Sequence, residues 1–139
     1  MAITFHYKQV NRDNGTSGVS PSIPVNLTGP AESMDVMAVL DSGADFTACG
    51  KDVAEILGLD LSGPAHPTFG VGGKVNAVRS NVNVSISKAH ETYAFDIPII
   101  VILEDCDFGI LLGRATFFDK FKITFDQDLK KIILKRNNK

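Results

Sequence analysis

The sequence has few of the features that mark disulfide-stabilised or metal-binding proteins. Only two of its 139 residues are cysteines, Cys49 and Cys106, and they fall in no Cys-x-x-Cys or Cys/His spacing that would hold a metal. We therefore expect reduced, buried thiols, no metal and no cofactor, and this cysteine usage favours a reducing compartment.

Long hydrophobic runs are also absent. The longest, Ile97 to Leu103, is interrupted by Pro98 and is far too short to cross a bilayer. The first residues, Met1 to Lys8, alternate between apolar and polar types and lack the apolar stretch of a signal peptide. The sequence therefore predicts a soluble, cytoplasmic protein with no membrane partner.

No charge of one sign dominates the chain. Fourteen basic residues stand against 16 acidic ones, for a net charge of -2, so nothing indicates attraction to nucleic acid. The basic segment 130–139 is interpreted as a solvated strand end and tail. With 44% apolar and 22% charged residues and no evident linker, the chain is expected to form one globular domain over residues 1–139.

Strand patterns dominate what is present. Apolar and polar residues alternate in four segments, 3–7, 23–27, 82–86 and 93–97. Continuous apolar runs at 36–40 and 99–103 predict buried strands, and the polar segment 11–18 predicts a loop. Helical spacing occurs only in Lys51 to Leu57 and around Phe117, Phe118 and Phe121. The pattern indicates an all-β, mostly antiparallel domain with two short helices.

The run Val36 to Leu40 ends in the tetrapeptide Asp41-Ser42-Gly43-Ala44, which occurs once. An ionised carboxylate costs several kcal/mol to bury unless it is paired or shares a proton. An acid at this position is therefore either exposed at the strand end or arranged to act with another charge. The simpler interpretation is a turn-forming Asp after a strand.

Three segments, in this order and spacing, resemble the retroviral-type (retropepsin-like) aspartic proteases. Val39 to Asp45 matches the family's apolar-apolar-Asp-Ser/Thr-Gly-Ala active-site turn, and the glycine-rich Phe69 to Val75 falls at the position of its flap. Ile110 to Arg114 matches the apolar-apolar-Gly element before the C-terminal helix. The resemblance implies a closed, barrel-like acid-protease fold.

The resemblance also implies a mechanism with Asp41 as the catalytic residue. Two carboxyl groups that share one proton can activate water and protonate the leaving nitrogen, as in aspartic proteases generally. Since the chain carries one such motif, the second carboxylate would come from another copy, in a two-fold homodimer. The substrate would be an extended polypeptide held beneath two flaps.

Further roles follow from the same resemblance. Ser42 is expected to hydrogen-bond across the two-fold axis and Gly43 to contact the substrate backbone, although each also fits a local turn. Ala44 and Asp45 are expected to line subsites. Asp45 is also expected to pair with Arg114, which follows Gly113, and so to support the turn. The alternative for Asp45 and Arg114 is exposed surface charge.

The flap is expected to contact substrate through Phe69, Gly70, Val71, Gly72 and Gly73. It has no tyrosine at its tip, so a hydrogen bond from a phenol is not expected there. Its glycines lack the third Gly and the following helix of a dinucleotide-binding motif. Apolar pocket walls are expected from residues such as Val71, Val75, Ile110 and Leu112.

Two rival hypotheses remain. One is a non-catalytic dimerisation or peptide-binding module that keeps the fold. The other is a protease regulated by its flanking segments, with the loop from Asn11 to Ser22 covering the cleft.

Overall fold

The computed structural model describes residues 2–11, 13–70, 73–105 and 109–137, and the statements below concern these residues. Most of them lie in strands: β1 (Ala2–His6), β2 (Lys8–Asn11), β3 (Ser17–Ser20), β4 (Ser22–Thr28), β5 (Ser33–Leu40), β6 (Thr47–Gly50), β7 (His66–Gly70), β8 (Gly73–Lys88), β9 (Glu91–Ile102), β10 (Ile110–Leu112), β11 (Phe121–Asp126) and β12 (Lys131–Arg136). The two helical segments are α1 (Lys51–Leu57) and η1 (Arg114–Phe118).

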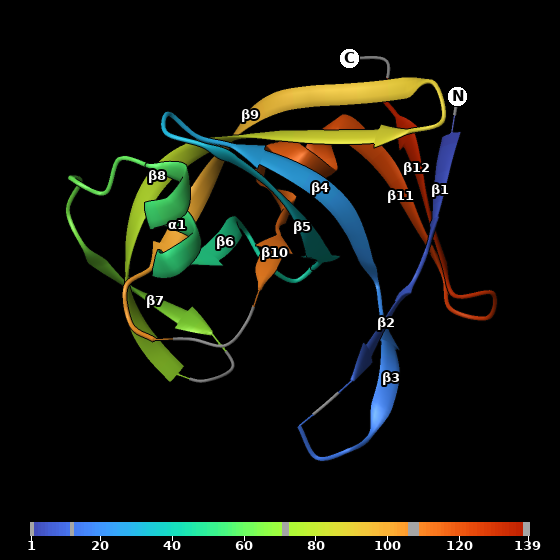
Figure 1. The fold of residues 1–139 in the computed structure, drawn as a ribbon, viewed down its shortest axis with the longest axis horizontal. Coiled ribbons are helices and arrows are strands. Elements are labelled where there is room, and N and C mark those ends of the chain that lie inside the picture. The colour runs from blue at the N-terminus through green and yellow to red at the C-terminus, as the bar shows by residue number, and fades with distance from the viewer. Residues whose placement is uncertain (1, 12, 71–72, 106–108, 138–139) are drawn as a thin grey trace.

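The main sheet closes on itself. Its strand order is β4-β5-β10-β6-β9-β8-β7, and an additional pairing of β4 with β8 makes a ring from which β7 branches (Figure 1). Among the strands that the structure describes in this sheet, only the β5–β10 and β6–β9 pairs are parallel. The prediction of an all-β, mostly antiparallel, closed fold is therefore confirmed.

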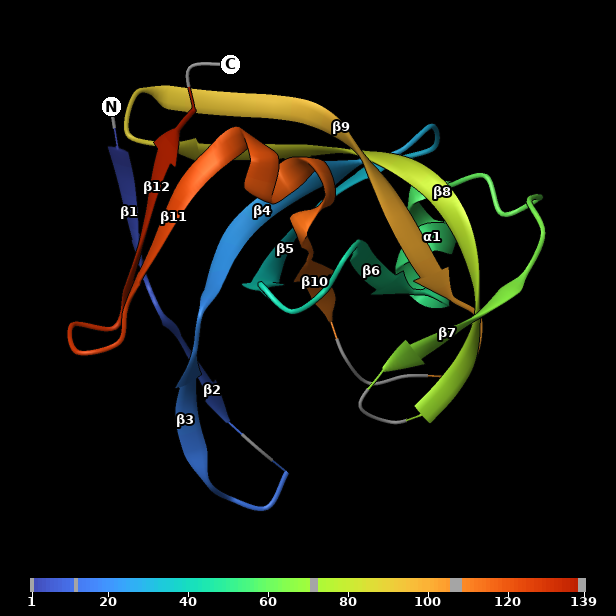
Figure 2. The same ribbon diagram turned by 180° about the vertical axis from the view of Figure 1, so that it is seen from behind.

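A second sheet, in the order β1-β12-β11, joins the two ends of the chain beside this ring (Figure 2). Its inward side chains, including Phe5, Ile132 and Leu134, belong to the same buried cluster as those of the ring. Aromatic rings connect the two parts: Phe121 lies 5.5 Å from Tyr93 and 5.3 Å from Phe117, between ring centroids. The core is thus continuous across both sheets.

The first helix has the predicted bounds. It ends at Gly58, whose left-handed backbone (φ 73°) allows its N–H to bond back to the carbonyls of the last turn. The second helical segment is irregular, because Ala115 and Thr116 have non-helical dihedrals. Phe121, expected in that helix, begins β11 instead. Tertiary packing of Phe117 and Phe121 explains the helix-like spacing, since both rings are buried in one cluster.

The segment predicted as a loop, residues 11–18, makes the far end of a hairpin formed by β2 and β3, which we call the β2–β3 arm (residues 8–20). Its strands pair only with each other, and it projects from the body in both ribbon views. No helix in the described part of the chain is long and apolar enough to span a membrane.

Candidate active site

Asp41 stands at the carboxyl end of β5 and is half-buried. Its backbone N–H donates to the carbonyl of Leu112 (3.0 Å), and its own carbonyl accepts from the N–H of Ala44 (3.2 Å). The Asp41 carboxylate accepts a hydrogen bond from the N–H of Gly43 at 2.9 Å. The backbone therefore fixes this carboxylate at the surface, where a second charged group could approach it.

The turn between β5 and β6 wraps around the end of β10. Strand β10 lies between the other two, with Leu111 paired to Val39 on one side and to Ala48 on the other. Beyond β10 the chain continues along the turn, where Arg114 N–H donates to Ala44 O and Ala115 N–H to Asp45 O, both at 2.9 Å. Segments about 70 residues apart in sequence thus hold one another by backbone hydrogen bonds.

Gly113 is required by this crossing. A β-carbon there would lie 2.3 Å from the carbonyl carbon and oxygen of Phe46, closer than any real contact. The N–H of Gly113 donates to the hydroxyl of Thr47 (3.2 Å), which is completely buried. Thr47 was not among the residues predicted from the sequence. The available signal was a polar residue at an inward position of a short strand, where it needs a partner.

Asp45 and Arg114 form an ion pair through Arg114 Nη2 and Asp45 Oδ1. Their side chains are nonetheless 74% and 55% exposed, so the pair contributes little to stability by itself. Ser42 and Gly43 are exposed at the tip of the turn, and Ala44 is half-buried. The structure therefore gathers Asp41 to Asp45, Gly113 and Arg114 at one place.

An apolar surface adjoins Asp41, made of alternate residues on the strands that carry the turn. Val39, Ala48 and Leu111 are half-buried on the outward face and are neighbours in the pairing register. Ile110 and Leu112, expected as pocket walls, are 2% and 0% exposed and belong to the core. That expectation was wrong because β10 directs Leu111 outward and its two neighbours inward.

The glycine-rich segment forms the predicted hairpin between β7 and β8, with Gly70 opposite Gly73 and Phe69 opposite Lys74. Its expected tip residues Val71 and Gly72 lie outside the described residues. Strand β8 joins β9 from Ala77 onward. At this junction the Glu104 carboxylate accepts the N–H of Asn76 at 2.8 Å, and Leu103 N–H donates to Asn76 O at 3.0 Å.

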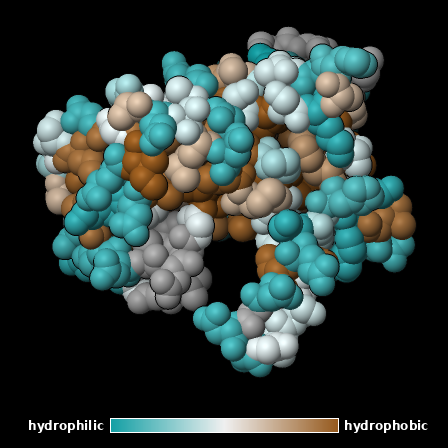
Figure 3. Space-filling view, in the orientation of Figure 1, coloured by the Kyte–Doolittle hydropathy of each residue, from teal (hydrophilic) through white to brown (hydrophobic). Residues whose placement is uncertain are grey.

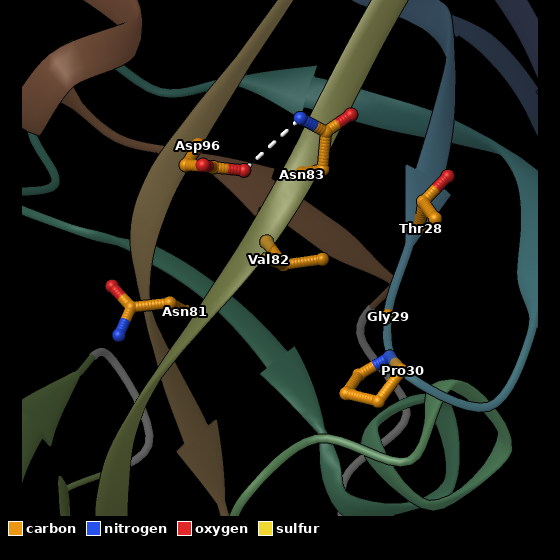
Figure 4. A pocket seen from close by; sticks show the side chains of 7 residues that line it. All are labelled: Thr28, Gly29, Pro30, Asn81, Val82, Asn83 and Asp96. Carbon is orange, nitrogen blue, oxygen red and sulfur yellow. Dashed lines mark hydrogen bonds between the residues drawn. The ribbon is translucent and has the colours of Figure 1, made fainter.

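A separate surface pocket lies at the other end of β4 (Figure 4). Ser22, near Asp41, pairs with Val39, whereas Thr28 of the pocket pairs with Ser33 at the far end of the same two strands. Asn83 donates to Asp96 (3.0 Å) beside it. The pocket therefore contains none of the predicted site residues, and the described residues include no His, Cys, Asp or Glu cluster suited to a metal.

Comparison with known proteins agrees with this geometry. Residues 23–116, which include the Asp41 turn and β10, match the family model described as aspartyl protease, and the chain belongs to that family. No curated protein sequence matches the chain.

Two solved structures share the fold. A retropepsin-like aspartic protease from Rickettsia conorii is 22% identical, with a TM-score of 0.58, over 96% of this chain and 90% of that one. The EIAV protease, solved with the inhibitor HBY-793, is 18% identical, with a TM-score of 0.52, over 79% of this chain and 93% of that one. At these identities the likeness supports the retropepsin-like fold.

Proposed function

We propose that the protein is an aspartic endopeptidase whose active site forms between two copies of the chain, each contributing Asp41. The observation that carries the proposal is the half-exposed Asp41 carboxylate on a turn clamped by Leu112, Ala44 and Gly43. A rigid, exposed acid of this kind is what water activation requires, since the reacting groups must be positioned before reaction.

The chemistry needs one proton shared by two carboxyl groups. The ionised carboxylate removes a proton from water, whose oxygen attacks the peptide carbonyl carbon. The protonated carboxyl polarises the carbonyl oxygen and then supplies the proton that the nitrogen takes as the C–N bond breaks. A single Asp41 cannot occupy both states, so the proposal includes a two-fold homodimer with Ser42 bonding across its axis.

The surface beside Asp41 suggests the substrate. Val39, Ala48 and Leu111 form an apolar wall next to the carboxylate, which favours apolar side chains near the cleaved bond. An extended polypeptide would lie between this wall and the β7–β8 hairpin, in contact with residues 43–45 and 69–73. Backbone hydrogen bonds would hold it in the manner of an added strand.

Digestion of a peptide library over a range of pH values tests the proposal. Wild type is expected to cleave, with a bell-shaped pH profile because one carboxyl must be ionised and the other protonated. Asp41→Asn is expected to lose at least about a hundredfold in rate. Asp128→Asn, in an exposed turn, is the matched control and should cleave as wild type does.

Equal cleavage by wild type and Asp41→Asn would exclude Asp41 as the catalyst. Binding of library peptides without cleavage at any pH would instead favour the non-catalytic peptide-binding module.

A further inference from the structure

The β2–β3 arm is a substantial element whose described residues contribute nothing to the hydrophobic core. Its strands, Lys8–Asn11 and Ser17–Ser20, pair only with each other. None of its described residues belongs to the hydrophobic core, and Val19 is 45% exposed. An isolated two-stranded hairpin is at best marginally stable in water, so this arm needs another surface to stabilise it.

The arm is firmly anchored at its base. On one side, Tyr7 N–H donates to the carbonyl of Lys130 (2.8 Å). On the other, the carbonyl of Pro21 accepts the N–H of Leu40 (3.0 Å), and the hydroxyls of Ser20 and Ser22 lie 2.8 Å apart. The direction in which the arm leaves the body is therefore set by the same strand that positions Asp41.

This anchoring places the arm beside the two-fold axis that the proposed function requires. Leu40, which bonds to the root of the arm, is the residue directly before Asp41. If two Asp41 carboxyls share a proton, the root of each arm lies close to both active-site turns. Each four-residue strand then extends roughly 13 Å further, at about 3.3 Å per residue.

The arm points away from its own subunit. In the space-filling view it stands as a mostly hydrophilic projection below the body, with open space between it and the left-hand part of the molecule (Figure 3). Both ribbon views show the arm extending away from the body. A second copy placed across the axis would occupy the region into which the arm extends.

We propose that the β2–β3 arm clasps a second copy of this chain beside the paired Asp41 turns, which builds on the homodimer of the proposed function. By two-fold symmetry each subunit grips the other, so the same residues act twice in one interface. The arm thereby gains the packing that it lacks in a single subunit, and the exposed Val19 becomes part of the contact.

Sedimentation equilibrium on three variants tests this. In the first, residues 9–19 are replaced by Asn-Gly, which can join Lys8 to Ser20 because these two residues lie directly opposite each other. The second is Val19→Asp, which leaves the arm in place. The control is Ile56→Asp, because Ile56 is an exposed aliphatic residue of similar exposure (47%) on α1.

We expect both arm variants to raise the dimer dissociation constant at least tenfold, and the control to leave it unchanged. Hydrogen exchange gives an independent readout: the amides of Val10 and Val19 should be better protected above the dissociation constant than below it. Asp41→Asn should show the same protection, since the clasp does not depend on catalysis. Circular dichroism establishes that each variant is folded.

The remaining outcomes separate this inference from the proposed function. Unchanged dimerisation and cleavage in both arm variants would overturn the clasp and leave the protease intact. Faster cleavage without the arm, at unchanged dimerisation, would also overturn the clasp and make the arm a strap over the cleft. Arm-dependent dimerisation with no cleavage by wild type would support the clasp and contradict the protease. A strict monomer would overturn both.

Discussion

The residues that support the Asp41 turn are more informative about the fold than Asp41 itself. Asp-Ser-Gly is a short pattern and is therefore not specific to one fold. Thr47 and Gly113, in contrast, come into contact only because β10 crosses beneath the turn. The Thr47 hydroxyl accepts the N–H of Gly113 inside the core, where that N–H has no access to water. The crossing therefore depends on one buried hydroxyl and one missing β-carbon.

Thr47→Val tests the hydroxyl. Valine fills the same volume but leaves the Gly113 N–H buried without an acceptor, which costs about 1–3 kcal/mol. We expect that loss in the free energy of unfolding measured with urea, together with slower peptide cleavage as the turn shifts. Thr124→Val, at an exposed position of β11, should change neither. Equal stability of the two variants would show that the Thr47 bond does not support the crossing.

Gly113→Ala tests the missing β-carbon. The added methyl would overlap the backbone of Phe46, and since no flexible side chain can yield, the loss should reach the upper end of about 1–3 kcal/mol. Gly109→Ala is the control, because its β-carbon would have no neighbour within 4 Å. Urea unfolding of both variants is the measurement, and a Gly113→Ala protein as stable as the control would contradict the close approach.

At the scale of elements, the sequence patterns predicted what alternation and capping control. Helix α1 ends at its glycine, and the strands with one buried face have the expected period. For the three apolar residues of β10, the sequence pattern did not predict which side chains face outward. A continuous apolar run does not say which residues face outward, and here the pairing of Leu111 between Val39 and Ala48 decides it.

The strands of the β2–β3 arm were not predicted, and residues 11–18 were interpreted only as a loop, for a related reason. The arm's residues have no buried face, so the sequence carries little of the alternation that marks a half-buried strand. Only backbone pairing makes it a hairpin. The proximity of Asp45 and Arg114, 69 residues apart, could likewise be predicted from family resemblance alone, because no local pattern encodes a contact at that separation.

The β7–β8 hairpin leaves the ring at a junction that Glu104 closes. Since its carboxylate accepts the Asn76 N–H at the point where β8 leaves β9, we expect Glu104→Ala to loosen this base. The Asn76 amide should exchange its hydrogen at least about tenfold faster, with global stability lower by less than about 1.5 kcal/mol. Glu55→Ala on α1 is the control, and an unchanged Asn76 exchange rate would show that Glu104 does not hold the junction.

At the scale of the whole molecule, each chain carries one Asp41, so the proposed activity depends on the assembly of two chains. If each active site needs two carboxylates, subunits carrying Asp41→Asn should inactivate the wild-type subunits with which they pair. Wild type and Asp41→Asn should be mixed in equal amounts and refolded together, at a total protein concentration far above the dimer dissociation constant. The mixture should retain about a quarter of the activity of wild type at the same total concentration. Random pairing leaves about a quarter of the dimers with two intact copies of Asp41.

Rates of peptide cleavage across a series of mixing ratios measure this dependence. The rate should follow the square of the wild-type fraction. Mixtures with Asp128→Asn, which keeps its Asp41, should show no loss at any ratio. A rate that falls in simple proportion to the wild-type fraction would mean that each subunit works alone, and the paired-carboxylate site would have to be abandoned even if Asp41 proved essential.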